Sequence, residues 1–516
     1  METNVYHSPF DGRYTSSEMN QLFSDDTKFS TWRELWIALA KAEQTLGLDI
    51  TNEQIAEMQQ YAYDINYDVA NEREREVRHD VMAHVYAFGQ QAKSAAGIIH
   101  LGATSCYVTD NTDIILMRDA LQLIRAKLLG TIKLLADFAD EYKDVPTLGY
   151  THYQPATPTT IGKRATLWLQ NFVNNLAELD FVTSQLKMLG CRGATGSSET
   201  FMKLFEGDEA KCKQLDQLIA EEFGFVEDTD ERLVTQEFDP DATVFRAFLK
   251  PMYLNPIYAP KVYDVSGQTY PRNLDYQVLN ALAAIAASAH KMALDIRLLQ
   301  HDKEIEEPFA KSQIGSSAMA YKRNPMRSER ICSLARYLGG LPVMAWETAS
   351  TQMLERTLDD SAGRRIYIPD AFRAADAILI LCSNITDGIV VNRAVINQRL
   401  DAELPFMAVE GMIMRAVEQG ANRQEMHAKL REHSLAVSQM IKQDGIPPIE
   451  VKARMLAQVF EDPDIPLTLE DVEDLFDPSN LVGRCPGQVT DYLQNVIYPL
   501  LVEEDGQITV DTIVTV

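Results

Sequence analysis

The sequence is poor in cysteine. Its 516 residues include six cysteines, and the closest pair, Cys191 and Cys212, is far apart along the chain. This spacing excludes a CxxC redox pair and a zinc knuckle, and a disulfide framework is not expected in a chain of this length. We expect reduced thiols, which are typical of the cytoplasm.

Long apolar runs are also missing. No stretch of 18 apolar residues occurs, and residues 1–14 contain no apolar core of a signal peptide. We therefore expect neither a membrane-spanning segment nor secretion, and we predict a cytoplasmic protein.

Positive charge is scarce. The chain has 48 Lys and Arg against 75 Asp and Glu, which gives a formal net charge of −27. Such a field repels nucleic-acid backbones and anionic membranes, so neither is expected as a partner. A site for a small anion would have to concentrate basic residues locally.

The familiar cofactor motifs are absent as well. The sequence has no GxGxxG, no P-loop, no HExxH and no GxSxG. A nucleotide would therefore not be held by a glycine-rich loop, and chemistry without a metal or a cofactor is the expectation.

What the sequence does contain is long stretches with helical periodicity. Residues 113–143 contain no proline, one glycine, and apolar residues at alternating spacings of three and four. Similar stretches cover 160–189, 274–300, 326–338 and 369–390. Strand signals are few, so the sequence predicts an all-α fold built on a long helical bundle, shared between subunits. Ordinary helices with unseen interruptions are the alternative.

The segment 312–336 combines flexibility with positive charge. Gly315, Ser316 and Ser317 are typical of a mobile loop, and Pro325 is placed to begin a helix. From 322 to 336 every charged residue except Glu329 is basic. This local charge suits carboxylate and phosphate ligands, although a solvated basic helix face is the alternative.

The same segment carries a family resemblance. The run from Gly315 to Met319, followed by Lys322 and Asn324-Pro325, resembles the GSSxMPxKxNP loop of the fumarase/aspartase superfamily, with Ala320 in place of the usual proline. Four other stretches agree in the same order: 78–84, 102–107, 151–156 and 355–361. The resemblance runs from Ser8 to Arg484 and is strongest to the adenylosuccinate lyases of the animal type.

The resemblance implies a fold in three domains. These are an N-terminal helical domain at 1–112, a central long-helix domain at 113–365, and a C-terminal helical domain at 366–516. The central domain holds the loop and an apparent insertion near 226–261, and it assembles into the core of a homotetramer.

The resemblance also implies a reaction. Family members release fumarate from adenylosuccinate to give AMP, and from SAICAR to give AICAR, by β-elimination in purine nucleotide biosynthesis. Ser316 matches the general base and His152 the general acid. A serine must be activated to act as a base, whereas a histidine suits proton donation near neutral pH.

The remaining matches are substrate contacts. Lys322, Asn324, Thr104 and Ser105 match groups that hold the succinyl carboxylates. The other expected contacts are Arg13, Tyr14, Arg78, His79, Asp80, Gln268, Arg330, Arg356, Ser361 and Arg365. Because these residues are far apart in sequence, the resemblance implies sites shared between subunits of the tetramer.

Two other functions stay open at this point. A sister lyase, such as argininosuccinate lyase or fumarase, shares the loop. A structural or binding relative without activity is the second alternative, although the chain retains Ser316, Lys322 and His152 together.

Overall fold

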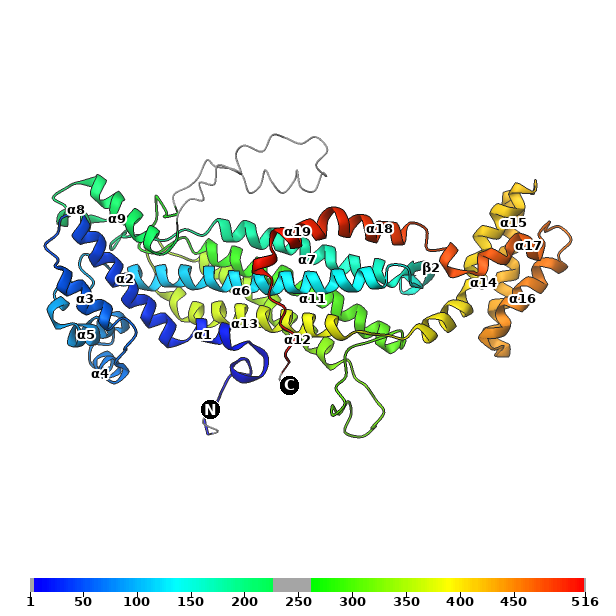
Figure 1. The fold of residues 1–516 in the computed structure, drawn as a ribbon, viewed down its shortest axis with the longest axis horizontal. Helices are drawn as coiled ribbons and strands as arrows, with labels where there is room; N and C mark the ends of the chain where they lie inside the picture. The colour runs from blue at the N-terminus through cyan, green and yellow to red at the C-terminus, as the bar shows by residue number, and fades with distance from the viewer. Residues whose placement is uncertain (1–3, 226–260, 515–516) are drawn as a thin grey trace.

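The computed structural model describes residues 4–225 and 261–514 and is an elongated, almost entirely helical molecule (Figure 1). Long helices lie side by side along its length and contact one another as a bundle. They are α6 (Ser105–Glu141), α7 (Ile161–Ser184), α11 (Asn273–His301), α12 (Met326–Ser350) and α13 (Asp359–Gly388). The prediction of an all-α fold with a long central bundle is confirmed.

Shorter helices surround the two ends of this bundle. One end is covered by α2 (Asp25–Thr45), α3 (Asn52–Gln60), α4 (Tyr67–Val77), α5 (Asp80–Gln91), α8 (Glu199–Leu204) and α9 (Glu209–Glu222). The other carries α14 (Arg393–Glu418), α15 (Arg423–Gln439), α16 (Pro448–Glu461) and α17 (Leu469–Val472). Three more lie along the bundle: α1 (Ser17–Leu22), α18 (Cys485–Tyr492) and α19 (Tyr498–Glu503).

Strands are few in the described part of the chain. An antiparallel hairpin of β1 (Pro146–Thr151) and β2 (Gln154–Thr160) joins α6 to α7 and contacts α14. A second small pair joins β3 (Ile305–Glu306) to β4 (Val390–Val391). Single turns of other helix types are η1 (Phe10–Tyr14), η2 (Lys93–Ala95), η4 (Met440–Asp444), η5 (Glu473–Phe476), η6 (Pro478–Asn480), η7 (Leu493–Ile497) and η8 (Asp505–Gln507).

Four of the predicted helix boundaries are wrong by five residues or more, and one of them is the end of α7, at Ser184 instead of 189. Helix α6 begins at Ser105, eight residues before the predicted start, and α12 continues beyond the predicted end at Leu338 to Ser350. Helix α13 begins at Asp359, so Pro369 lies inside it instead of at its start. Each extension buries further side chains against neighbouring helices, and this packing outweighs the low helix propensity of proline and glycine.

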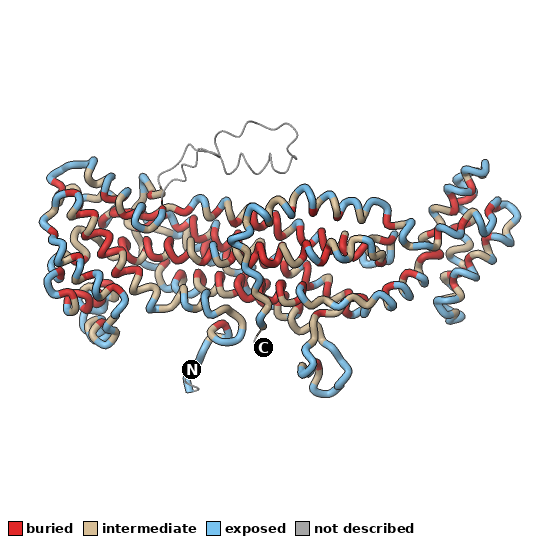
Figure 2. The backbone as a smooth tube through the Cα atoms, viewed as in Figure 1, coloured by how far each residue is buried: buried red, intermediate tan, exposed pale blue. Residues whose placement is uncertain are grey.

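Burial follows the inward faces of the bundle helices (Figure 2). A second apolar core is confined to α14–α17 and the turns beside them. The three predicted domains stay a prediction, because the boundaries after 112 and 365 fall within α6 and α13. The expected insertion at 226–261 lies outside the described residues, apart from Lys261.

Among the helices that the structure describes, none combines the length and the hydropathy that crossing a membrane requires.

Candidate active site

The N-terminal ends of α5 and α6 bring together two of the sequence motifs. His79 is the N-cap of α5, and its Nδ1 accepts a hydrogen bond from the Met82 amide at 3.4 Å. Its Nε2 lies 3.3 Å from Oγ of Ser105, the first residue of α6. The Met82 contact directs Nδ1 at the backbone and leaves Nε2 facing the serine hydroxyl.

Arg365 of α13 contacts the same group of residues. Its guanidinium donates to the Asp80 carboxylate at 2.9 Å. Burial opposes ionisation of Asp80, but the Val81 amide and Arg365 more than offset it and hold the pKa of Asp80 below its ordinary value. Arg78, in a left-handed conformation at the end of α4, is exposed beside them.

The start of α6 contributes further polar groups. Thr104 is the N-cap residue, but its side chain makes no cap hydrogen bond. Unpaired amides at the start of a helix favour an anion, and this helix is 37 residues long. Gln268 lies beside it, because its Oε1 accepts from the Cys106 thiol at 3.7 Å. We call His79, Asp80, Thr104, Ser105 and Arg365 the α5–α6 cluster.

Arg356 and Ser361 are positioned next to this cluster by the segment that precedes α13. The amide of Gln268 donates to the Glu355 carbonyl at 3.0 Å, which places Arg356 nearby. The Arg356 guanidinium lies 2.9 Å from both oxygens of Asp360, the neighbour of Ser361. Asp360 is itself buried and accepts from Arg272 at 2.7 Å, so this segment has a rigid base.

Arg13, Tyr14 and Arg330 form a second group, the Tyr14 cluster. The Arg330 guanidinium lies 5.2 Å from the centre of the Tyr14 ring, and that of Arg13 lies 5.9 Å from it. Burial is the main cause that lowers the pKa of Arg330, and the positive charges of Arg13 and Arg327 lower it further. Such a concentration of positive charge suits a phosphate group.

The 312–325 loop holds the predicted base. Ser316 Oγ accepts from the Met319 amide at 3.1 Å, and the Asn324 side chain donates to the Gly315 carbonyl at 2.8 Å. Gly315 is required here, because a Cβ atom would lie 2.1 Å from the Lys322 carbonyl oxygen. In this conformation Ser316 and Asn324 shape the loop itself.

Lys322 faces a pocket of about 350 Å³ beside the loop. Arg297 and His301 of α11 line it together with Arg323 and Asn324. Arg297 and His301 thus add to the positive charge expected at 322–336, and Glu329 lines the same pocket.

His152 lies on a different part of the molecule. It occupies the turn between β1 and β2, where it is exposed. That hairpin and helix α5 lie at opposite ends of the long central bundle (Figure 1). The structure therefore divides the predicted residues among the α5–α6 cluster, the Tyr14 cluster, the 312–325 loop and the His152 turn, and one chain cannot unite His152 with the α5–α6 cluster.

Lys28 is a residue that the sequence analysis missed. Its ammonium group lies 4.8 Å from the Phe29 ring centre and 5.3 Å from that of Trp32. Burial lowers its pKa, as does the charge of Arg365, whereas Asp113, Asp25 and Asp80 oppose the change. In the sequence, this residue could have been noticed as a lysine beside aromatic residues in a largely apolar helical stretch.

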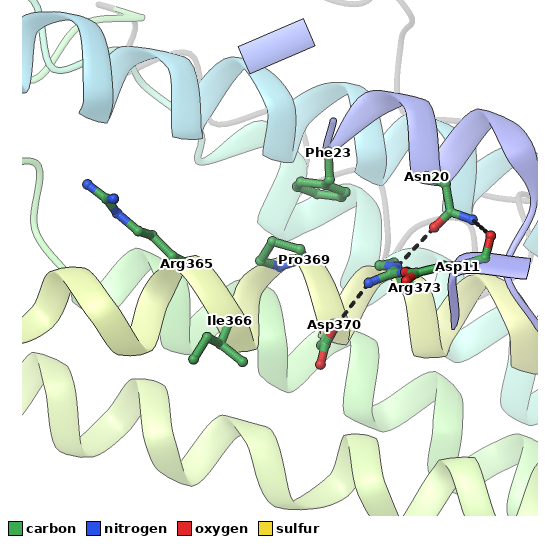
Figure 3. Close-up of a pocket in the computed structure, with 8 residues that line it drawn as sticks. All are labelled: Asp11, Asn20, Phe23, Arg365, Ile366, Pro369, Asp370 and Arg373. Carbon is green, nitrogen blue, oxygen red and sulfur yellow. Dashed lines mark hydrogen bonds and ion pairs between the residues drawn. The ribbon is translucent and has the colours of Figure 1, made fainter. Parts of the chain in front are cut away.

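A pocket of about 520 Å³ lies between the N-terminal segment and α13 (Figure 3). It is lined by Asp11, Asn20, Phe23, Arg365, Ile366, Pro369, Asp370 and Arg373. Arg373 pairs with Asp11 and Asp370, so its charge is balanced. Arg365 lies at the far end and connects the pocket to the α5–α6 cluster.

Within residues 4–225 and 261–514, no three His, Cys, Asp or Glu side chains are grouped so that they could hold a metal ion.

Comparison with known proteins gives a consistent family. Residues 12–237 and 262–340 match the family model described as "Lyase", and residues 405–492 match the one described as "Adenylosuccinate lyase C-terminus". The first match leaves out 238–261, within the expected insertion.

Relatives cover nearly the full chain. The adenylosuccinate lyase of Saccharomyces cerevisiae is 46% identical over 95% of this chain and 94% of its own length. That of Schizosaccharomyces pombe is 42% identical, over 98% and 97%. That of Schistosoma mansoni is 40% identical, over 97% and 96%.

Solved structures share the fold. A 3-carboxy-cis,cis-muconate lactonizing enzyme from Pseudomonas putida has a TM-score of 0.75 at 21% identity, covering 94% of this chain and 98% of its own. A fumarate lyase from Mesorhizobium has a TM-score of 0.73 at 22% identity, covering 95% and 99%. With the near full-length relatives and both family models in agreement, the chain belongs to the adenylosuccinate lyase family, within the larger lyase family.

Proposed function

We propose that this chain releases fumarate from adenylosuccinate to give AMP, and from SAICAR to give AICAR, as an enzyme of purine nucleotide biosynthesis. The observation that carries the proposal is the similarity over almost the whole chain to proteins named adenylosuccinate lyase. The loop with Ser316 and Lys322 and the concentrated positive charge around it support the same reaction.

The proposed chemistry is a β-elimination. Ser316 Oγ takes the proton from the carbon beside one carboxylate, and the C–H electrons form the double bond of fumarate. The bond between the neighbouring carbon and the nucleobase nitrogen breaks, and His152 gives that nitrogen a proton. Lys322 lies six residues beyond Ser316 and stabilises the charge that spreads onto the carboxylate.

The other groups hold the substrate. In this proposal the Tyr14 cluster and Arg356, Ser361 and Arg365 bind the phosphate and ribose. Thr104 and Ser105, at the start of α6, donate to a succinyl carboxylate, which the helix N-terminus also favours. His79, with its Nε2 directed at Ser105, completes that contact.

We also propose a homotetramer in which each site is built from several subunits. The separation of His152 from α5 along the molecule supports it. So do exposed large apolar side chains along α12, the segment after it and the start of α13, which a covering partner would bury. They are Tyr337, Val343, Met344, Trp346, Met353, Leu354, Leu358 and Ile366.

A cytoplasmic location is part of the same proposal. All six cysteines are free, which agrees with a reducing compartment.

The test is fumarate formation by the purified protein with adenylosuccinate, argininosuccinate or malate, without added metal. We expect fumarate from adenylosuccinate, a lower yield or none from the other two, and a second activity with SAICAR. Turnover of argininosuccinate or malate instead would identify a sister lyase. No turnover of any substrate by the folded protein would favour the non-catalytic alternative.

A further inference from the structure

The turn that carries His152 is strained. His152 and Tyr153 are the two central residues of the β1–β2 turn, and both have positive φ, 53° and 57°. Two-residue hairpin turns of this type favour Asn-Gly, because residues with bulky side chains are disfavoured in the left-handed region. The neighbouring structure must therefore hold the turn in place.

A buried carboxylate on the adjoining segment contacts the hairpin. Glu304 is 1% exposed and accepts hydrogen bonds from Thr147 Oγ1 at 3.0 Å and from the Tyr150 hydroxyl at 3.2 Å. Both donors are on β1, and Tyr150 is two residues before His152. The carboxylate thus fixes the strand that leads directly into the strained turn.

Arg399 of α14 completes this contact. Its Nε lies 2.8 Å from Glu304 Oε1, and its NH2 group donates to the Tyr150 hydroxyl at 2.9 Å. Burial raises the pKa of Tyr150 to about 12, so the hydroxyl stays protonated and can both accept from Arg399 and donate to Glu304. We call Glu304, Tyr150 and Arg399 the hairpin anchor.

The segment that contains Glu304 also contacts the start of α12, directly after the 312–325 loop. The buried Glu307 carboxylate accepts from the amides of Arg327 and Ser328, each at 3.0 Å. Residues 304–307 therefore tie the His152 hairpin and the Ser316 loop to one another.

Stability alone does not account for the hairpin anchor. Glu304 is buried but the Arg399 side chain is 34% exposed, so this ion pair adds little net stability, whereas it holds the two side chains in one geometry. A fixed geometry matters most where a proton must be delivered to one atom.

We infer that Glu304, with Arg399 and Tyr150, is a positioning group that holds the strained turn and thereby aims His152 at the leaving nitrogen. The inference rests on the role proposed above for His152. Loss of the hairpin anchor should lower kcat through His152 and leave substrate binding largely intact.

The test compares Tyr150→Phe, Glu304→Gln and His152→Ala in the full-length protein with adenylosuccinate as substrate. We expect kcat to fall about tenfold or more in Tyr150→Phe and further in Glu304→Gln, with KM changed little. Tyr150→Phe removes one hydroxyl and leaves Glu304 paired with Arg399, so it stays informative if Glu304→Gln fails to fold.

Double variants separate positioning from general damage. In a His152→Ala background, adding Tyr150→Phe should not lower the residual kcat, because no imidazole remains to be aimed. The matched control is Asp216→Asn, which breaks another buried ion pair, with Arg192 at 2.6 Å, away from the hairpin. It should lower thermal stability without changing kcat.

Two results would overturn the inference alone: wild-type kcat in Tyr150→Phe beside a strongly reduced kcat in His152→Ala, or an equal fold-loss from Tyr150→Phe in both backgrounds. Full turnover by His152→Ala would instead refute the proposed role of His152 as the general acid. The inference about the hairpin anchor would then fail as well.

Discussion

At the scale of single residues, Glu43 of α2 has an unusual environment. Its side chain is fully buried, and neither carboxylate oxygen has a hydrogen-bond partner within the described residues. Burial raises the pKa of Glu43 from 4.5 to about 8. The folded protein therefore holds a proton at neutral pH that the unfolded chain releases.

The sign of the effect on stability follows from that proton. Between pH 4.5 and about pH 8 the folded state binds more protons at Glu43 than the unfolded state, so stability falls as the pH rises. By pH 7 this difference in proton binding lowers the free energy of unfolding by about 3 kcal/mol relative to acidic pH. We expect the melting temperature of Glu43→Gln to fall less between pH 5 and pH 8 than that of the wild type. Thermal unfolding at each pH measures this. Equal slopes for the two proteins would show that Glu43 does not titrate in this range.

At the scale of elements, the C-terminal tail depends on one glycine of α6. The Thr509 amide donates to the Ala126 carbonyl at 3.0 Å, and the Asn384 side chain donates to the Thr512 carbonyl at 2.7 Å. The tail thus lies across α6 and α13. A Cβ at Gly130 would lie 2.0 Å from the Thr509 carbonyl oxygen, so only glycine allows this approach.

We expect Gly130→Ala to displace the tail and to destabilise the protein by about 1–3 kcal/mol, because the new methyl group overlaps the tail backbone. Thermal unfolding and limited proteolysis of the C-terminus would measure both effects. The control is Gly487→Ala in α18, where an added Cβ meets nothing within 4 Å. Replacing a helical glycine by alanine should there be neutral or stabilising. A tail that stays protected in Gly130→Ala would contradict this account.

At the scale of the whole molecule, the positions of His79 and His152 give a test of assembly. Helix α5, which His79 caps, and the β1–β2 turn with His152 lie at opposite ends of the bundle of one subunit. The two residues can therefore meet only between subunits. We expect His79→Ala and His152→Ala each to retain only a small residual activity alone and to gain activity when refolded together. If each site takes one residue from each of two subunits, random mixing leaves about one quarter of the sites intact. Activity of the mixture with adenylosuccinate measures this, with each variant refolded alone as the control. A mixture no more active than its components would argue against shared sites.

The sequence predicted more of the fold than of the contacts in the candidate site. Helical periodicity predicted the long helices, since apolar residues at spacings of three and four form one face whatever the partner is. It missed the first part of α13, because Pro369 is tolerated where packing on neighbouring helices outweighs the lost hydrogen bond, and it also missed the start of α6 at Ser105. Lys28 and Glu304 also escaped notice, since neither is part of a motif.

The sequence by itself determined the chemistry available: a hydroxyl and an ammonium group on a small-residue loop, an imidazole in a separate motif, and local positive charge in an acidic chain. These are properties of residue type and spacing, and they need no partner. Only the tertiary structure decided which residues meet. It joined His79 to Ser105, Asp80 to Arg365 and Glu304 to Tyr150, contacts between residues far apart in sequence. Their proximity depends on helices that pack through burial of apolar surface, a force without direction that no local pattern encodes.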